Sequence, residues 1–337
     1  MSDAAVASGL RVAIMTDETG WHTGRLKKAF RARGVDARCV DLAACRIDTS
    51  WSPYGVAIPG FAREVPDAVF VRGIAGGTFE QVTLRLGILH ALRECGVPVY
   101  NDARAIERSV DKSMTSFLLH RAGVPTPPAW ATESAAFAQR VLMRETAAAR
   151  QVVMKPLFGS QGKGLRRLGS QATRAGACGS LTPLPSLRSY QQVAYLQRFV
   201  GTARARRAGF DWRVLVIGGR AVAAMRRSGG RGWIHNVARG ARCEPCALEP
   251  TLAAIAERAA AALGLDYAGV DLIPDPSMPD DAGVPLVLEV NGVAAWRGLQ
   301  SVTSVDIAAA LADDLLDRKL AASRASTVPV VPIHAGR

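Results

Sequence analysis

Lysine is scarce in this chain of 337 residues, although the chain is strongly basic. Six lysines stand beside 36 arginines, and the formal net charge is +13. A basic balance fits anionic small substrates or nucleic acid. The arginines do not gather in one segment and no nucleic-acid-binding module is recognisable, so we expect no nucleic-acid partner. Where lysine does occur, it indicates a need for a compact ammonium rather than the planar fork of arginine.

Long apolar runs are missing too. No run approaches the ~20 apolar residues that cross a bilayer, so we expect no membrane partner. Residues 1–10 lack a basic stretch followed by an apolar core, which is not typical of a secretory signal. These absences predict a soluble cytoplasmic protein.

Cysteine is thinly spread, with six residues at 39, 45, 95, 178, 243 and 246. In a cytoplasmic chain of this length we expect free thiols. Cys243 and Cys246 form a single C-x-x-C, and no further ligands stand at the spacing that zinc requires. A redox pair is the alternative to the structural or incidental role that we expect.

The first third of the chain alternates strand and helix patterns. Apolar runs bounded by turn residues predict strands at 10–15, 36–42, 68–72 and 97–100, with helices at 21–33 and 79–93. This rhythm predicts an α/β domain with a parallel sheet. Ligands bind at the carboxyl ends of such strands. Arg72 lies at one of these ends and is a candidate for substrate binding, with a tight turn into a helix as the alternative.

The rest of the chain is less regular. Residues 101–124 are predicted to be mainly helical, and the prolines of 125–128 end that segment. Further strands are predicted at 151–155, 165–168 and 195–200, and a hairpin at 210–226 around Gly218-Gly219. Helices are predicted at 134–150, 250–263 and 305–320.

Three polar residues lie in two apolar runs near the C-terminal end. Asp271 stands in 269–273, and Glu289 and Asn291 stand in 285–291. Glu289 and Asn291 are two apart, so on a strand both point to the same face. Two carboxylates and an amide oxygen form a hard donor set that suits Mg²⁺. The alternative is that arginines pair with the two carboxylates, because an unpaired buried charge is costly.

Lys155 ends a predicted strand and precedes a glycine-rich loop. Gly159, Gly162 and Gly164 allow backbone N–H groups to approach an anion. The loop is not a Walker A motif, because no G-K-[S/T] opens a helix after it. A strand, a glycine tip and a returning strand predict a flap over phosphates, with an ordinary flexible hairpin as the alternative.

Taken in order, the lysines, the glycine flap and the Asp…Glu-x-Asn set resemble the ATP-grasp superfamily, and specifically its carboxylate–amine ligases of the ribosomal-protein glutamate ligase type. The resemblance covers about residues 99–316. It implies an α+β ATP-grasp fold in which the nucleotide lies between two lobes. The implied parts are an N-terminal Rossmann-like pre-ATP-grasp domain at 1–103, a small lobe with the flap at 104–196, a large lobe with the metal site at 197–322 and a mobile tail at 323–337.

The resemblance also implies roles for individual residues. Those implied to bind nucleotide are Lys112, Lys155, Gly159, Ser160, Gln161, Gly162, Gln197, Arg198, Phe199, Val200 and Asp211. Asp271, Glu289 and Asn291 are implied to hold two Mg²⁺ ions, with Mn²⁺ as an alternative ion. The implied catalytic residues, on the phosphate and acyl-phosphate side, are Arg226, Arg227 and Asn236. Candidates for substrate binding are Arg72, Arg239 and Arg297, and plain surface salt bridges are the alternative for Arg72 and Arg297.

The implied reaction converts a carboxylate into an acyl phosphate with ATP, after which an amine displaces phosphate. Residues 292–300 depart from the ribosomal-protein ligases, and this stretch with Trp296-Arg297 is more similar to ligases that add glutamate to tetrahydromethanopterin. We therefore expect an ADP-forming ligase that joins L-glutamate to such a cofactor. Its expected partners are a small-molecule carboxylate, an amino acid and further copies of itself in a dimer or tetramer. The alternatives are a glutamate ligase that acts on a protein C-terminus and a non-catalytic nucleotide- or RNA-binding module.

Overall fold

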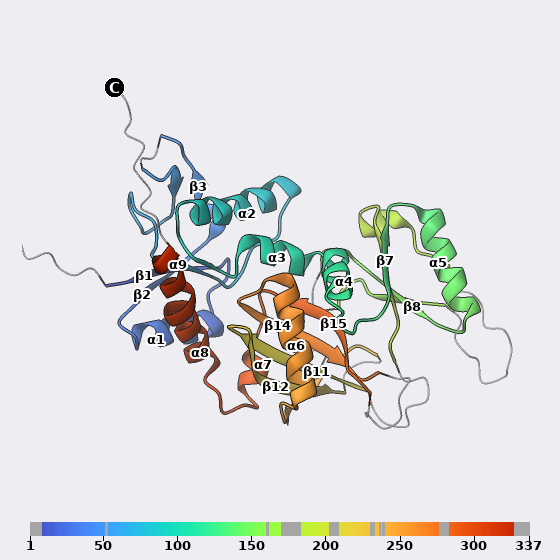
Figure 1. Cartoon of the computed structure of the whole chain (residues 1–337). Coiled ribbons are helices and arrows are strands. Elements are labelled where there is room, and N and C mark those ends of the chain that lie inside the picture. Colours follow the sequence, from blue (N-terminus) through green and yellow to red (C-terminus); the bar gives the residue numbers. More distant parts are fainter. Residues whose placement is uncertain are drawn as a thin grey trace, which may run out of the picture.

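The computed structural model describes residues 9–50, 53–159, 162–169, 183–201, 209–229, 233–235, 237, 240–275 and 283–326. Within them, three sheets of four or five strands and a small two-stranded sheet form the framework. Figure 1 shows the N-terminal sheet at one end of the molecule, the five-stranded sheet in the middle and the remaining sheet at the other end.

The N-terminal sheet has the strand order β2-β1-β5-β6, and all of its pairs are parallel. Every residue of β5 is buried, because helices cover both faces of a parallel sheet. The predicted α/β domain is confirmed. Its elements are β1 (Arg11–Met15), α1 (Trp21–Arg31), β2 (Asp36–Val40), η1 (Leu42–Ala44), β3 (Arg46–Ile47), β4 (Val56–Ala57), β5 (Ala68–Val71), α2 (Phe79–Glu94) and β6 (Val99–Tyr100).

The small-lobe sheet is antiparallel, with the order β7-β10-β8-β9. The chain leaves β8, passes the glycine loop and returns along β9, as predicted. One helix packs its buried side, Ala138, Val141 and Leu142, on this sheet and completes a core separate from the others. The elements are β7 (Ala129–Thr132), α5 (Ala135–Ala147), β8 (Val152–Lys155), β9 (Arg166–Leu168), η2 (Leu187–Tyr190) and β10 (Ala194–Arg198).

The large-lobe sheet has the order β13-β12-β11-β14-β15 and is antiparallel throughout. The predicted helical segment 101–124 divides in two at Asp111, because the Asp111 carboxylate accepts hydrogen bonds from the backbone of Ser113 and Met114 and so caps a new helix. The elements are α3 (Ala103–Val110), α4 (Lys112–Arg121), β11 (Phe210–Ile217), β12 (Arg220–Ser228), β13 (Arg242–Cys246), α6 (Pro250–Leu263), β14 (Tyr267–Ile273) and β15 (Leu286–Asn291).

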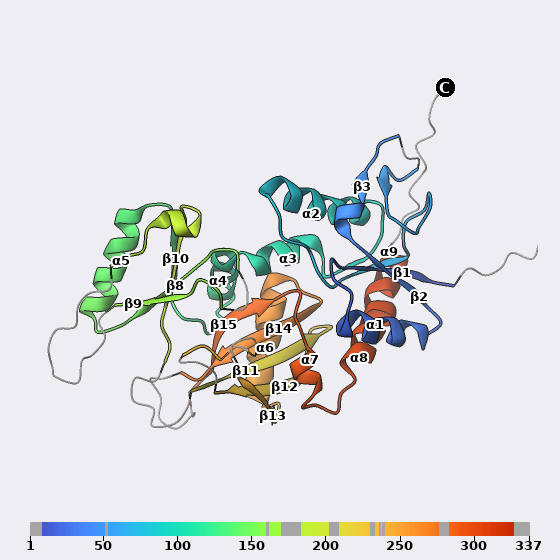
Figure 2. The same ribbon diagram turned by 180° about the vertical axis from the view of Figure 1, so that it is seen from behind.

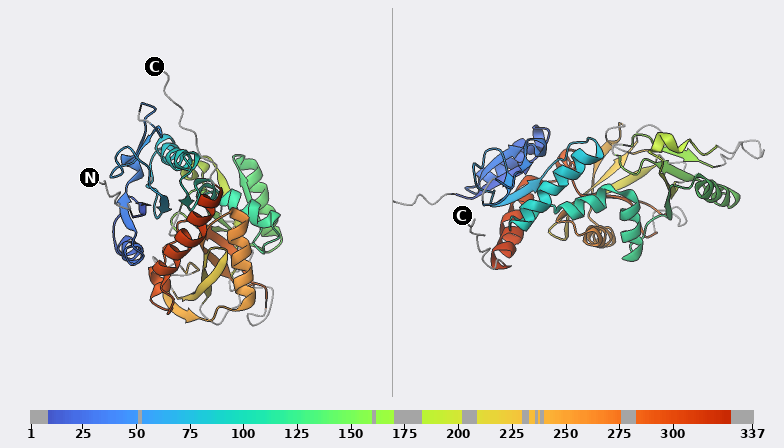
Figure 3. Two further views of the ribbon diagram at one scale, coloured as in Figure 1. Left: turned by 60° about the vertical axis from the view of Figure 1, so that its left-hand side comes forward. Right: turned by 90° about the horizontal axis from the view of Figure 1, so that it is seen from above.

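The last helices return to the N-terminal domain. They are α7 (Arg297–Gln300), α8 (Ile307–Asp313), the π-helical η4 (Asp314–Leu320) and α9 (Ala321–Ser326). Figures 2 and 3 show α8 beside α1. One continuous apolar core contains Leu26 and Phe30 of α1, Leu311 of α8 and Met225 of the five-stranded sheet. The N-terminal domain and the large lobe therefore share a core. The domain boundaries expected from the sequence stay predictions.

None of the helices in the described parts of the chain combines the length and the apolar character needed to cross a membrane.

Candidate active site

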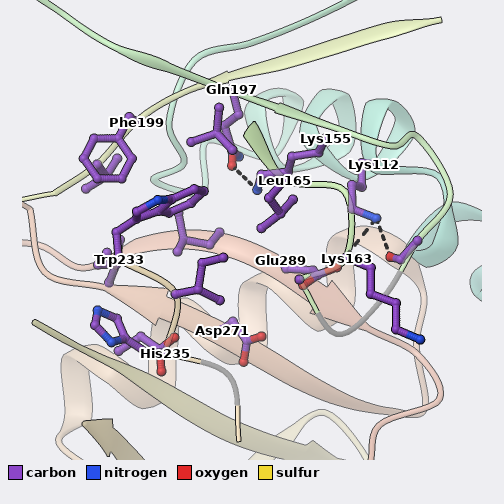
Figure 4. Close-up of a pocket in the computed structure, with 18 of the residues that line it drawn as sticks. Lys112, Lys155, Lys163, Leu165, Gln197, Phe199, Trp233, His235, Asp271 and Glu289 are labelled. Atoms are coloured by element: carbon purple, nitrogen blue, oxygen red, sulfur yellow. Dashed lines mark hydrogen bonds and ion pairs between the residues drawn. The ribbon is translucent and has the colours of Figure 1, made fainter. Parts of the chain in front are cut away.

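A pocket lies between the small-lobe sheet and the large-lobe sheet (Figure 4). Residues that are far apart in the sequence meet there, because the ends of β8 and β10 face β11, β12, β14 and β15. Most of the predicted nucleotide and metal residues are among its lining: Lys112, Lys155, Gly159, Gly162, Gln197, Arg198, Phe199, Val200, Asp211, Arg227, Asp271 and Glu289. Ser160, Gln161, Asn236 and Arg239 lie outside the described residues.

Two of the six lysines meet at one end of the pocket. Lys155 Nζ donates to Gln197 Oε1 at 2.6 Å. Lys112, the first residue of α4, donates to the carbonyl of Gly159 at 2.7 Å and lies 3.9 Å from Glu289 Oε1. Burial lowers the pKa of Lys155 to about 8, although Glu289 opposes the shift and Lys112 adds to it. Burial also lowers the pKa of Lys112. Two desolvated ammonium groups side by side favour a bound anion.

The other end of the pocket is apolar. The rings of Phe199 and Trp233 meet edge to face with centroids 5.6 Å apart (Figure 4). Val153, Leu165 and Ile273 complete this slot, which suits a flat aromatic base. Trp233 was not predicted. Its only sequence signal was a large aromatic residue within the glycine- and arginine-rich segment 226–240.

Arg198 does not turn its charge into the slot. Its guanidinium donates to Glu145 Oε2 at 2.8 Å, on the small-lobe side. Arg198 therefore lines the pocket with its backbone rather than with its charge.

A β-bulge shapes the strand that carries Glu289. Asp271 pairs with Glu289, but Leu272 pairs with Val287, so Leu288 is the extra residue. Leu288 and Glu289 both line the pocket although they are neighbours in the sequence. Simple alternation forbids this, and bulges of this kind re-aim side chains next to functional sites. The bulge was not visible in the sequence.

Asp271 is held by two arginines. Arg213 binds it through two N–H groups, with Nη2 at 2.9 Å from Oδ2, and Arg227 Nη2 lies 3.1 Å from Oδ1. Arg227 also binds Asp211, at 2.6 and 2.8 Å. Burial favours the neutral form of Asp271, but the two guanidiniums outweigh it and hold the pKa of that carboxyl below its usual range. The alternative of arginine pairing is therefore realised at Asp271.

The predicted metal ligands lie on two paired strands. Asp271 and Glu289 are opposite one another, and Asn291 is opposite Gly269. The Asn291 amide donates to the Gly269 carbonyl at 3.3 Å, which leaves Oδ1 free to face a cation. Asn291 is not among the pocket-lining residues. Within the described residues, no group of three or more His, Cys, Asp or Glu side chains is placed to share a metal ion. The predicted metal ligands are two carboxylates and one amide, and oxygen donors of this kind fit Mg²⁺.

Arg226 and Arg227 point to opposite faces of β12, because neighbouring strand residues alternate. Arg227 lines the pocket. Arg226 stacks over the ring of Phe210 at 3.8 Å and lies 3.8 Å from Glu244. The structure therefore brings Arg227, and not Arg226, to the remaining candidate residues.

Arg72 and Arg297 lie away from this pocket, around His22. The Arg297 guanidinium is 5.9 Å from the centre of the Trp21 ring. Arg72 Nε is buried and has no hydrogen-bond partner among the described residues. Neither guanidinium forms an ion pair in the described structure, so the salt-bridge alternative is not realised for either.

The two cysteines of the C-x-x-C pair lie on opposite faces of the large-lobe sheet. Cys243 and Cys246 are three apart on β13, so their side chains point to opposite faces. Cys243 packs into the core shared with the N-terminal domain, and Cys246 packs on the α6 side. This geometry excludes a shared metal or a disulfide between them. The expectation of free thiols is confirmed for the described cysteines at 39, 45, 95, 243 and 246, and Cys178 lies outside the described residues.

Comparison with known proteins agrees with this geometry. A family model described as the RimK-like ATP-grasp domain matches residues 109–315, and one described as the RimK PreATP-grasp domain matches residues 10–106. The chain belongs to the RimK-like ATP-grasp family. It is accordingly an ATP-dependent, ADP-forming carboxylate–amine ligase, as the sequence resemblance indicated.

Individual relatives show which ligases of this family the chain is similar to. The tetrahydromethanopterin:alpha-L-glutamate ligase of Methanosarcina acetivorans is 30% identical over 85% of this chain and 92% of its own length. The enzyme of the same name from Methanococcus maripaludis is 31% identical, over 91% and 98%. A probable alpha-L-glutamate ligase of Halorhodospira halophila is 30% identical, over 89% and 92%. The predicted similarity to the tetrahydromethanopterin ligases is confirmed.

Solved structures share the fold. The ATP-grasp ligase PsnB, complexed with minimal precursor, Mg and ADP, superimposes with a TM-score of 0.65 at 22% identity over 92% of this chain and 98% of its own. The D-cycloserine synthetase DcsG superimposes with a TM-score of 0.64 at 20% identity over 91% and 99%. At this identity the likeness concerns the fold, and it confirms the predicted ATP-grasp architecture.

Proposed function

We propose that this ligase joins the amine of L-glutamate to the carboxylate of a tetrahydromethanopterin-type one-carbon cofactor. The names of the two methanogen relatives support this substrate class. The observation that carries the chemistry is the two-ended pocket, in which an apolar slot at Phe199 leads to a cluster of Lys112, Lys155 and Glu289. A nucleotide matches this pocket, because its flat base suits the apolar slot and its phosphates suit the lysines.

The lysines would hold the nucleotide phosphates. Lys155 is half-buried and donates to Gln197, and Lys112 reaches the base of the glycine loop. An anion bound between them would stabilise the charged form of both ammonium groups and so offset the cost of their burial. The loop between β8 and β9 would close over that anion and keep water from the acyl phosphate.

Asp271, Glu289 and Asn291 would hold two Mg²⁺ ions. Bound there, the ions would neutralise charge that develops on the transferring phosphoryl group. Glu289 would suit this role, because its nearest described cation, Lys112, is 3.9 Å away and its oxygens are free to face the pocket. Asp271 keeps lone pairs available beside its arginine contacts.

Arg227 would stabilise negative charge at the reacting group. It already bridges Asp211 and Asp271, so its position is fixed before substrate arrives. Preorganised charge of this kind is among the largest contributions to catalysis. Arg226 would take no part in this step, because it packs on Phe210 and faces Glu244.

An ADP-release assay tests the proposal. Purified protein is given Mg-ATP, L-glutamate and a tetrahydromethanopterin-type carboxylate, and the product is identified by mass. We expect ADP release that requires both substrates and falls about 10²–10³-fold in Glu289→Gln and Lys155→Met. Lys28→Met is the matched control, because Lys28 is exposed on α1 outside the pocket. A mass increase on a protein C-terminus, with none on the small carrier, would overturn the substrate assignment.

A further inference from the structure

A second polar cluster lies where the N-terminal sheet meets the large lobe. It is built from His22 on α1, Arg72 directly after β5, and Trp296 with Arg297 at the start of α7. Figure 2 shows α7 lying between the large-lobe sheet and the helices α1 and α8. The rings pack closely, with Trp296 centred 4.8 Å from Trp21 and 4.9 Å from His22.

Two donors in this cluster are buried without partners. Trp296 is 1% exposed, and its Nε1–H has no acceptor among the described residues. Arg72 Nε is in the same condition. A buried donor without an acceptor costs roughly 1–3 kcal/mol, so two of them in one place indicate that an acceptor belongs there.

His22 is held in a form that can donate as well. Its Nε2 lies 3.2 Å from the backbone N of Trp296 and accepts that N–H, so the ring proton sits on Nδ1. Burial first, and then the positive charges of Arg72 and Arg297, lower the pKa of His22 to about 4. The imidazole is therefore neutral, and all positive charge in the cluster comes from the two guanidiniums. Asp17 lies beside Gly73 but is exposed and forms no ion pair with either guanidinium in the described structure.

The cluster shares a face of the large-lobe sheet with the pocket. Tyr267 donates to the Val71 carbonyl at 2.7 Å, which fixes the residue before Arg72 against β14. Tyr267 and Asp271 are four apart on β14 and point to the same side, roughly 13 Å apart at about 3.3 Å per residue. This spacing places the cluster outside the pocket and beyond Asp271 along β14, on the side away from Ile273 and the apolar slot.

We propose that Arg72, Arg297 and His22 form a carboxylate subsite that holds the anionic end of one of the two ligase substrates. The inference rests on the proposed ligase function. The shared chemistry is a carboxylate, and two sources would supply it: the side chain of the incoming glutamate, or an acidic group on the acceptor. Arg72 and Arg297 would supply the charge, while Arg72 Nε, His22 Nδ1–H and Trp296 Nε1–H would supply further donors.

Arg297 is the residue to change, because it is exposed and its removal leaves the packing of Trp296 intact. In steady-state assays, Arg297→Gln should raise one substrate KM about 10- to 100-fold with little change in kcat, and Arg297→Lys should recover part of the loss. Arg25→Gln is the matched control. Arg25 lies on α1 beside the cluster but pairs with Asp306 at 3.2 Å, and its loss should leave both KM values unchanged.

The arms of the assay identify the source of the carboxylate. A raised KM for glutamate, and none for the acceptor, assigns the subsite to the amino acid, and the reverse assigns it to the acceptor. Unchanged KM values for both substrates in Arg297→Gln would overturn the subsite while leaving the ligase function standing.

A binding measurement separates failure of the subsite from failure of the ligase assignment. Glutarate is titrated into the protein while tryptophan fluorescence is followed, with uncharged glutaramide as the comparison. We expect saturable quenching by glutarate only, weakened about 10-fold or more in Arg297→Gln. Equal binding of glutarate by wild type and Arg297→Gln, or no binding by wild type, would overturn the subsite whether or not ADP is released.

Discussion

Two buried carboxylates in this protein each accept hydrogen bonds from two arginines, and only one of them lines the pocket. Glu145 in the small lobe has a side chain 1% exposed and binds Arg150 at 2.9 Å and Arg198 at 2.8 Å. Asp271 in the large lobe is 7% exposed and binds Arg213 and Arg227. Residue type, burial and pairing are nearly the same, so none of these identifies a functional carboxylate.

The arginine partners make the difference. Those of Glu145 are 43% and 31% exposed, so water can still solvate them. Those of Asp271 are 13% and 5% exposed, and Arg227 is shared with a second carboxylate, Asp211. The network of Glu145 holds a helix to a strand, whereas the network of Asp271 fixes charge at a place where a ligand can meet it.

Removing the charge of Asp271 should have the largest effect. In Asp271→Asn, two buried guanidiniums lose their partner, and the free energy of unfolding should fall by about 3–5 kcal/mol. The rate of ADP release per folded molecule should fall about 10²–10³-fold. Urea unfolding and the ADP assay measure the two effects. Activity close to that of wild type in the folded variant would show that Asp271, like Glu145, serves stability alone.

The matching change in the small lobe should affect stability alone. Glu145→Gln should lower the free energy of unfolding by about 1–3 kcal/mol, because a buried acceptor is weakened while its arginines keep contact with water. The KM for ATP and kcat should stay within about twofold of wild type below the new unfolding temperature. A large rise in the KM for ATP would instead connect this network to the nucleotide.

Lys155 should make the pocket sensitive to pH. With its pKa near 8, its ammonium is charged below that pH and loses its charge above it. In the nucleotide-free enzyme, kcat/KM for ATP should therefore fall by up to tenfold per pH unit above about 8. Lys155→Arg should remove this inflection from the pH range of the assay, since arginine stays charged there. The same inflection in both proteins would show that another group titrates.

The smallest effect is expected at the divided cysteine pair. Cys246→Ser should leave activity unchanged and alter the free energy of unfolding by less than about 1 kcal/mol, since Cys246 lies half-buried on the α6 side of β13. Zinc analysis of the purified wild-type protein should find none bound through this pair. A stoichiometric zinc ion lost in Cys246→Ser would contradict the geometry.

The order of motifs along the chain predicted the fold and most of the pocket, because lysines and carboxylates stand out against an arginine-rich background. It could not place single side chains. Alternation along β12 separates Arg226 from Arg227, and the bulge at Leu288 depends on pairing with β14. β7 and β13 were not predicted as strands, because both are edge strands with little burial, and Pro245 interrupts the second.

The core that α1 shares with α8 sets a limit on the order in which the chain can fold during synthesis. Leu26 and Phe30 leave the ribosome long before Ile307 and Leu311, which share their core. Domains generally fold as they emerge, first parts first. The small lobe draws its whole buried core from residues between 138 and 196. The small lobe can therefore mature before the N-terminal sheet, which keeps one apolar face open until α8 has left the ribosome.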